Sequence, residues 1–308
     1  MKIAHISDLH LCSNYKKQNA IKTKRLIQHA LDNGADHIII TGDISDNANE
    51  KDFLILRKIL KTYNILEWDK TSLVIGNHDI FGGVQTAQDI INFPAKCIKT
   101  NYDIKVQTFF KYFEELFINT ISISDENPFP FAKIINNIAL IGMNSIDVYS
   151  KIKNPLASNG LVDKIQRLRL IKLLSKEELK GKIKIGMIHH HFYKNNVPSK
   201  SSENGLWNRI ENFTMKLRGK KKLLKIFNDH DLKLVLHGHS HEVKEYERKG
   251  VRFLNAGGSI DNAKKVPSMY FLKINSDEIE IELLELEEKL KPTFEIIPEN
   301  VFAASIAG

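Results

Sequence analysis

Cysteine is scarce in this sequence, whose 308 residues include only Cys12 and Cys97. Two cysteines are too few for a disulfide framework and neither lies in a CxxC pattern, which excludes a disulfide-rich scaffold and disfavours a thiolate zinc site. Long apolar runs are also missing. The longest, such as residues 38–40, fall far short of the roughly 20 residues that span a bilayer. The N-terminus has no apolar stretch of signal-peptide length, so we expect a cytoplasmic protein.

Internal repeats and low-complexity linkers are absent as well. Hydrophobic residues make up 42% of the chain, which is typical of a globular protein with a sizeable core. Lys and Arg total 45 against 37 Asp and Glu, for a net charge of +8. This modest positive balance favours an anionic substrate or surface, although it is also common in proteins that bind neither.

Short β-branched runs alternate with helical segments, which is the pattern of an α/β fold. The expected strands are residues 2–7, 37–41, 72–75, 138–143, 183–188, 232–236, 251–255, 269–274 and 278–284. The expected helices are residues 16–33, 50–63 and 163–180. Gly34 is a natural C-terminal stop for the first of them.

Two long stretches interrupt this pattern, at residues 80–137 and 192–230. Long insertions in compact domains often act as lids or binding loops, although they can equally form an outer helical layer. Within the second stretch, residues 206–225 combine Lys and Arg with apolar side chains such as Trp207 and Phe213. Such a segment can lie on an anionic membrane surface, or it can be a solvated helix that packs its apolar side on the core, which we favour.

Polar side chains gather just after five of the expected strands, at residues 7–10, 42–46, 76–79, 189–191 and 237–241. Open α/β sheets place their ligand sites at the carboxyl ends of strands. Eight of the 12 histidines lie in these clusters. Buried carboxylates and imidazoles are costly without a compensating cation, so packing alone does not explain the gathering. The other four histidines, His5, His29, His37 and His230, we interpret as packed or surface residues.

The clustered donors are carboxylates, an amide and imidazoles, which suit Mn, Fe or Zn. Six or seven donors exceed what one ion needs if a position is to stay open for substrate. Two ions that share one bridging carboxylate fit better, and such a pair can bind both the nucleophile and the phosphoryl oxygens of an in-line displacement.

In this order along the chain, the motifs Asp8-x-His10, Gly42-Asp43, Gly76-Asn77-His78-Asp79, His189 and Gly238-His239-x-His241 resemble those of calcineurin-like metallophosphoesterases. The opening at residues 5–8 is typical of the bacterial single-domain class that includes cyclic-nucleotide and glycerophosphodiester phosphodiesterases. The resemblance implies an α/β, four-layer αββα sandwich: two mixed β-sheets flanked by helices, with helical insertions. Residues 1–308 would form one domain, in which strands at about 251–286 complete the second sheet.

The resemblance also implies a role for each residue. One divalent ion would be held by Asp8, His10 and His241, and the other by Asn77, His189 and His239. Asp43 would bridge them. A metal-bridging hydroxide would attack phosphorus, because bound ions lower the pKa of water. His78 would protonate the leaving alkoxide or stabilise developing charge, and Asp79 would orient His78.

Two positions depart from the family pattern. The third block often reads His-His-Pro, whereas here it is His189-His190-His191-Phe192. Either His189 or His190 is therefore the ligand, and we expect His189 because it comes first after the apolar strand. Relatives often carry Asp where this chain has Asn144. This difference affects a supporting contact and leaves the set of metal ligands unchanged.

We expect a small-molecule phosphate ester as substrate, and a diester in preference to a monoester. Phosphatases commonly meet the second charge of a monoester with Arg or Lys beside the metals, and no Arg or Lys lies within the five ligand blocks. The nearest in sequence are Lys2, Lys184, Lys194 and Lys244. The two insertions are the segments that would bring a cation over the site.

Four alternative functions stay open. A phosphomonoesterase follows if an insertion supplies the missing cation. A pyrophosphatase acting on a nucleotide-sugar lipid would use residues 206–225 for peripheral membrane contact. A DNA exonuclease is weakly favoured by the positive charge, but little chain follows His241 to form a DNA-capping domain. A non-enzymatic scaffold is disfavoured because all the expected ligands are present. The sequence does not indicate an oligomeric state.

Overall fold

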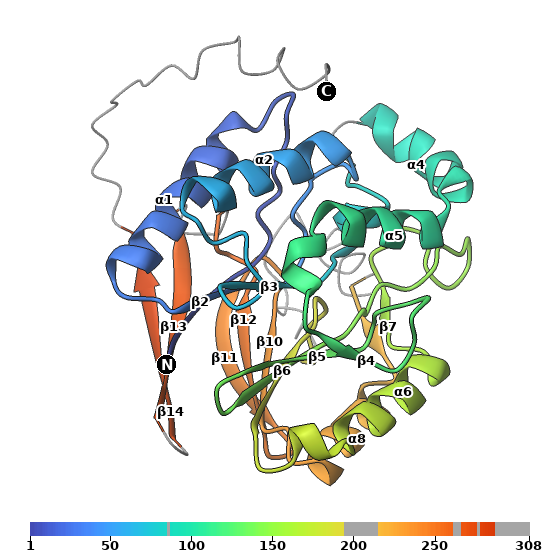
Figure 1. Ribbon diagram of the computed structural model, residues 1–308. Helices are drawn as coiled ribbons and strands as arrows, with labels where there is room; N and C mark the ends of the chain where they lie inside the picture. Colours follow the sequence, from blue (N-terminus) through green and yellow to red (C-terminus); the bar gives the residue numbers. More distant parts are fainter. Residues whose placement is uncertain (85–86, 194–214, 261–265, 276–277, 287–308) are drawn as a thin grey trace, which may run out of the picture.

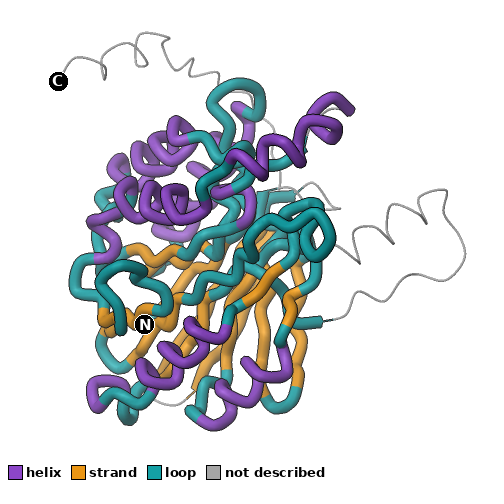
Figure 2. Tube along the Cα trace, turned by 90° about the vertical axis from the view of Figure 1, so that its right-hand side faces the viewer, coloured by secondary structure: helices purple, strands orange, loops and turns teal. Residues whose placement is uncertain are grey.

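The computed structural model describes the chain except for residues 85–86, 194–214, 261–265, 276–277 and 287–308. Two β-sheets lie face to face, and helices cover their outer sides (Figures 1 and 2). This is the four-layer αββα arrangement expected from the sequence. In the described part of the chain, no helix is both long and apolar enough to cross a membrane.

The first sheet has five strands in the order β14-β13-β1-β2-β3. Their bounds are Lys2–Ile6 (β1), His37–Ile40 (β2), Thr71–Leu73 (β3), Ser268–Asn275 (β13) and Glu278–Glu285 (β14). The first three strands run parallel, while β13 is antiparallel to β1 and to β14. Strands β2 and β3 are buried throughout, as parallel strands covered on both faces must be.

The second sheet has seven strands in the order β11-β12-β10-β8-β6-β5-β4. Their bounds are Ile121–Ser122 (β4), Phe131–Ile135 (β5), Ile138–Gly142 (β6), Ile183–Met187 (β8), Leu234–His237 (β10), Val243–Arg248 (β11) and Val251–Ala256 (β12). The central strands β6, β8, β10 and β12 are parallel, and the edges are antiparallel hairpins. A short parallel pair, β7 (Gly160–Leu161) and β9 (Leu217–Arg218), lies apart from both sheets.

Alternation along β6 shows how the layers pack. Leu140 belongs to the large core cluster that also contains Ile3 and Ile39 of the first sheet. Ala139 and Ile141 belong instead to the cluster formed with helices α6 (Lys164–Leu174) and α8 (Lys220–Asp229). Side chains of a strand point alternately to opposite faces, so the second sheet is covered by the first on one side and by α6 and α8 on the other. Helices α1 (Lys17–Asp32) and α2 (Glu50–Thr62) cover the outer face of the first sheet (Figure 1).

The expected insertion at residues 80–137 is only partly an insertion. Helices α3 (Asn77–Ile80), α4 (Ala87–Lys99) and α5 (Tyr102–Tyr112) and the 3-10 helix η1 (Glu114–Phe117) come first, but β4 and β5 then join the second sheet. The prediction missed β5 because Lys133 interrupts its apolar run. Lys133 is nevertheless buried, and its Nζ donates to the carbonyl of Thr71 in β3 at 2.7 Å.

The prediction that residues 251–286 complete the second sheet is wrong for two of three strands. Strand β12 does lie in that sheet, but β13 and β14 extend the first one through the pairing of β13 with β1. Pairing between strands that lie far apart in the sequence cannot be recognised from the local pattern of residues.

Two further expectations concern helices. Residues 163–180 divide into α6 and the 3-10 helix η2 (Glu177–Leu179). Residues 206–214 of the basic segment 206–225 lie outside the described residues. Its last part begins α8, which buries Leu223, Leu224 and Phe227 against the second sheet. For that part, the structure shows a helix packing its apolar side on the core.

Candidate metal centre

The candidate ligands all follow the carboxyl ends of strands, from both sheets. Asp8 and His10 follow β1, Asp43 follows β2, and Asn77 opens α3 after β3. From the second sheet, His189 follows β8, while His239 and His241 follow β10. The amide of His239 donates to both carboxylate oxygens of Asp8, at 3.1 and 3.0 Å, so the two sheets are joined at this point.

Backbone conformation turns these side chains toward one another. Asp8, His10, Asp43, His239 and His241 all have positive φ, between 43° and 77°. Few residues other than Gly adopt this region, and Asp, Asn and His do so most readily. Such outliers persist where the surrounding structure holds them, and they cluster at functional sites.

Close backbone approach also constrains two of the motif glycines. A Cβ on Gly76 would lie 2.1 Å from Oδ1 of Asp43, and a Cβ on Gly238 would lie 2.1 Å from Oδ2 of Asp8. Both distances are far shorter than any tolerated contact. Glycine at these positions therefore leaves room for the carboxylates of the neighbouring loops.

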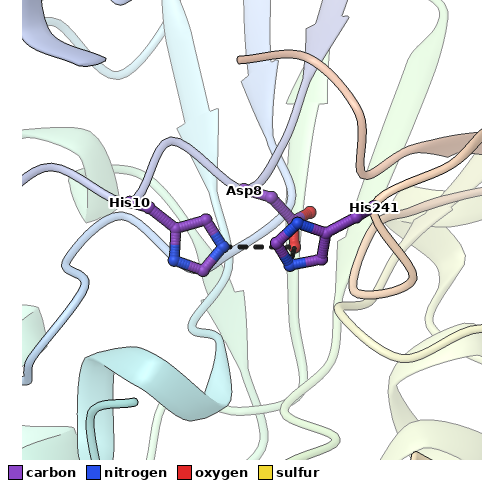
Figure 3. Close-up of side chains that lie close together, drawn as sticks. All are labelled: Asp8, His10 and His241. Carbon is purple, nitrogen blue, oxygen red and sulfur yellow. Dashed lines mark ion pairs between the residues drawn. The ribbon is translucent and has the colours of Figure 1, made fainter. Parts of the chain in front are cut away.

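The first cluster consists of Asp8, His10 and His241 (Figure 3), whose ligand atoms lie within 4.8 Å of one another. Oδ1 of Asp8 is 3.9 Å from Nε2 of His10 and 4.0 Å from Nε2 of His241. Nε2 of His10 is buried and has no hydrogen-bond partner among the described residues. A buried polar atom without a partner is costly, and a cation between these three groups would satisfy it.

The second cluster is centred on His189. Its Nε2 lies 3.1 Å from Oδ1 of Asn77, 3.1 Å from Nδ1 of His239 and 3.3 Å from Oδ2 of Asp43. Its Nδ1 faces the carbonyl of Thr41 at 2.8 Å, which holds the ring with Nε2 toward the cluster. Four donor atoms thus converge, and the set of carboxylate, amide oxygen and two imidazoles suits a divalent transition metal.

Asp43 lies between the two clusters. Its Oδ2 is 3.3 Å from Nε2 of His189 and 3.9 Å from Nε2 of His10, and its Oδ1 accepts from the amide of His78 at 2.9 Å. Burial acts to raise the pKa of Asp43, but the charges of His189 and His78 hold it well below its usual range. This carboxylate stays ionised between the two clusters, as a bridging ligand must.

His78 lies beside the first cluster, with its ring centroid 4.7 Å from that of His10. Its Nδ1 faces the main-chain carbonyl of Asp46 at 2.9 Å. A carbonyl only accepts, so this contact fixes the tautomer with a proton on Nδ1. Burial lowers the pKa of His78 below its ordinary value.

Asp79 does not have the place that the sequence suggested. Its two carboxylate oxygens accept from the amides of Ser45 and Gly76, each at 2.8 Å. Asp79 therefore ties together the loops after β2 and β3, and the partner of the His78 ring is Asp46. Asp46 lies three residues after Asp43, but a main-chain carbonyl leaves no signature in the sequence.

Asp46 also supports His10. Its Oδ1 lies 3.2 Å from Nδ1 of His10 and 2.8 Å from Nζ of Lys16. His10 and Lys16 help to hold the pKa of the Asp46 carboxyl below its usual range against the effect of burial. Lys16 was missed as a neighbour of the site, because only the fold brings it beside Asp46.

The two histidines of the third block lie in different surroundings. His189 lies in the second cluster, whereas the His190 ring lies between Oγ of Ser145 at 2.8 Å and the carbonyl of Ser158 at 3.2 Å. Both ring nitrogens of His190 thus face protein groups, which leaves His189 as the candidate ligand. Asn144, where relatives often have Asp, donates to the hydroxyl of Tyr102 and supports a loop.

Comparison with known proteins assigns the family. Residues 1–243 match the family model of the calcineurin-like phosphoesterases. The chain belongs to this family. As a calcineurin-like phosphoesterase it carries each of the motifs described above, and its two donor clusters fit two divalent ions.

The individual relatives either match only part of this chain or have a low sequence identity with it. A probable cyclic nucleotide phosphodiesterase of Coxiella burnetii is 32% identical over 129 residues, which are 39% of this chain and 46% of that protein. The chain thus matches about half the length of this curated relative. Among solved structures, a dimetal phosphatase from Danio rerio has a TM-score of 0.58 at 11% identity, covering 92% of this chain and 98% of the other. The purple acid phosphatase PPD1 from yellow lupin (Lupinus luteus) seeds has a TM-score of 0.59 at 12% identity, covering 92% and 51%. At such identities, the structural likeness concerns the fold.

Proposed function

We propose that this protein hydrolyses phosphate diesters with two divalent metal ions, of Mn, Fe or Zn. The observation that carries the proposal is the position of Asp43, whose Oδ2 faces both His10 and His189. A carboxylate shared by two histidine-rich clusters supports a dinuclear centre more directly than either cluster alone. The family membership supports phosphoester chemistry.

The chain's own residues have distinct tasks in this reaction. When bound, the ions supply an activated water and neutralise charge on the phosphoryl oxygens. Asp8, His10 and His241 would hold one ion, Asn77, His189 and His239 would hold the other, and Asp43 would serve both. His78 keeps its Nδ1 on the Asp46 carbonyl, which leaves Nε2 as the atom that exchanges a proton with the leaving group.

Charge around the site supports a diester over a monoester. Lys16 adds a cation near the ligands, since its Nζ lies 2.8 Å from Oδ1 of Asp46, and the same oxygen lies 3.2 Å from Nδ1 of His10. Its ammonium, however, is engaged by the carboxylate of Asp46, so it adds little net charge for a dianion. The phosphodiesterase relative also supports a diester.

The test compares kcat/KM for bis-p-nitrophenyl phosphate and p-nitrophenyl phosphate with the same Mn²⁺ loading. We expect the diester to be cleaved more efficiently. A clear preference for the monoester would overturn the diester assignment while leaving metal-dependent hydrolysis in place. Turnover of neither compound, in protein shown to hold two ions, would count against hydrolysis itself.

A further inference from the structure

Exposed aliphatic side chains are concentrated in one part of the chain. The described residues include 16 large hydrophobic side chains that are exposed, and six of them fall within residues 148–172, less than a tenth of the sequence. Exposed apolar side chains that lie together commonly mark a surface that contacts a partner or a membrane. The six are Val148, Ile152, Leu156, Ile165, Leu168 and Ile171.

Helix α6, on the outside of the second sheet (Figure 1), is apolar on two opposite faces. Its inner leucines join the core cluster shared with α8. Ile165, Leu168 and Ile171 recur at three-residue spacing on the outer face and are 62%, 51% and 38% exposed. A helix that is apolar all round is normally covered on every side. The described part of the chain provides no cover for this outer face.

The loop before β7 presents the other aliphatic side chains in a fixed shape. Buried Asn154 donates from Nδ2 to the carbonyls of Asp147 and Val148, at 3.2 and 3.3 Å. Its Oδ1 accepts from the amide of Asn159 at 2.9 Å. These bonds close the loop on itself, and Ile152 projects from it with 87% of its surface exposed. Only residues 160–163 connect the loop to α6, a span of at most about 18 Å, so the two form one continuous surface.

The charges of this surface are nearly all positive. Residues 148–172 hold six Lys and Arg and one acidic residue, Asp163. The carboxylate of Asp163 is already engaged at the start of α6, where Oδ1 accepts from the amide of Gln166 at 2.7 Å. Aliphatic side chains between cations suit an anionic lipid surface, because the apolar groups enter the interface while the cations meet the headgroups. The cations are Lys151, Lys153, Lys164, Arg167, Arg169 and Lys172.

We propose that residues 148–172 form a docking surface for an anionic lipid bilayer. Ile152 and the outer stripe of α6 enter the headgroup boundary, and the lysines beside them contact lipid phosphates. A second copy of the chain fits less well, because a symmetric contact would bring the same positive charges together. A protein partner is also less favoured, since hot spots of protein interfaces are enriched in Trp and Tyr, whereas the six exposed side chains are all aliphatic.

The docking surface lies beside the metal centre. Residues at both ends of the loop contact the His190 ring, through Oγ of Ser145 at 2.8 Å and the carbonyl of Ser158 at 3.2 Å. His190 is the neighbour of the candidate ligand His189. Docking would therefore hold the metal centre close to the bilayer. The inference does not depend on the proposed hydrolysis, and its test measures binding alone.

Sedimentation with vesicles tests the charge of the docking surface. The full chain is mixed with vesicles of phosphatidylcholine, alone or in equal mixture with phosphatidylglycerol. We expect binding to the anionic vesicles to be at least about 10-fold stronger and to weaken as salt is added. The triple variant Lys151→Gln/Lys153→Gln/Lys172→Gln should lose roughly 100-fold in affinity for the anionic vesicles, because each cation near the surface contributes to binding.

A second triple variant tests the aliphatic side chains. Ile152→Gln/Ile165→Gln/Leu168→Gln should lose at least about 10-fold in affinity, because its apolar area no longer enters the interface. Both triple variants change exposed side chains, so their denaturant unfolding midpoints should equal that of the wild type. Two matched controls remove as many exposed groups elsewhere and should bind like the wild type. They are Lys51→Gln/Lys58→Gln/Lys61→Gln on α2, and Leu54→Gln/Ile91→Gln/Ile98→Gln on α2 and α4.

An environment-sensitive dye reports whether the loop itself enters the interface. Cys12 and Cys97 are buried, so a dye attached to the Ile152→Cys variant labels one site. Its emission should shift to the blue with anionic vesicles, while the same dye on Ile91→Cys should not respond. The proposal is overturned if the wild type does not bind anionic vesicles, if the control triple variants lose as much affinity, or if the dye at residue 152 does not shift.

Discussion

Asp43 is the residue that would join both halves of the proposed metal centre. Substitution by Asn keeps the side-chain shape but removes the negative charge that faces His10 and His189. We expect Asp43→Asn to lose activity and to retain fewer than two ions per chain. Elemental analysis after gel filtration measures this directly. Two tightly bound ions in this variant would show that the bridge is another group.

His78 has a different task, since it is held by a main-chain carbonyl beside the ligands. His78→Ala should keep both ions and lower kcat by roughly 10²–10⁴-fold, the usual contribution of general acid–base catalysis. The loss should be smaller for esters with good leaving groups, which need no proton. An equal loss for good and poor leaving groups would point to charge stabilisation instead. His29→Ala, outside the five clusters, is the control.

The residues proposed as ligands could be found from the sequence because each lies a few positions after a strand, in a local motif. The contacts that hold these residues and His78 in place could not be predicted in this way. Asp79 is adjacent to His78 in sequence, yet it binds the amides of Ser45 and Gly76, and Asp46 holds His78 through its carbonyl. Main-chain contacts between loops depend on tertiary packing, which residue types do not reveal.

At the level of secondary structure elements, locally patterned strands were predicted best. Strands β1, β2, β8 and β10 are short apolar runs bounded by the polar motifs, and periodicity identifies them. The sheet to which β13 belongs could not be predicted, because its partner β1 lies more than 250 residues earlier.

The buried Lys133 of strand β5 leads to a prediction about how the free energy of unfolding depends on pH. Burial lowers the pKa of Lys133 to about 7. Between that value and the ordinary lysine pKa of about 10.4, the unfolded chain binds the extra proton, so stability should rise with pH by at most about 1.4 kcal/mol per pH unit. Lys133→Met should remove this dependence. Denaturant unfolding at pH 7 and pH 9 tests it, and an unchanged slope in the variant would contradict the assignment to Lys133.

At the scale of the whole molecule, the two sheets meet where their strand ends bring the ligands together. The first sheet supplies Asp8, His10, Asp43 and Asn77, and the second supplies His189, His239 and His241. Each candidate ion would therefore have ligands from both sheets. Such a centre forms only when the four layers are assembled, which couples metal binding to the fold.

Titration of metal into chelated protein tests the central claim most directly. Protein stripped of metal is supplied with increasing Mn²⁺, and bound ions and hydrolysis of bis-p-nitrophenyl phosphate are measured on the same samples. The dinuclear account predicts no activity in the stripped protein and full activity when two ions are bound per chain. Full activity in the stripped protein, or a plateau at one bound ion, would contradict it.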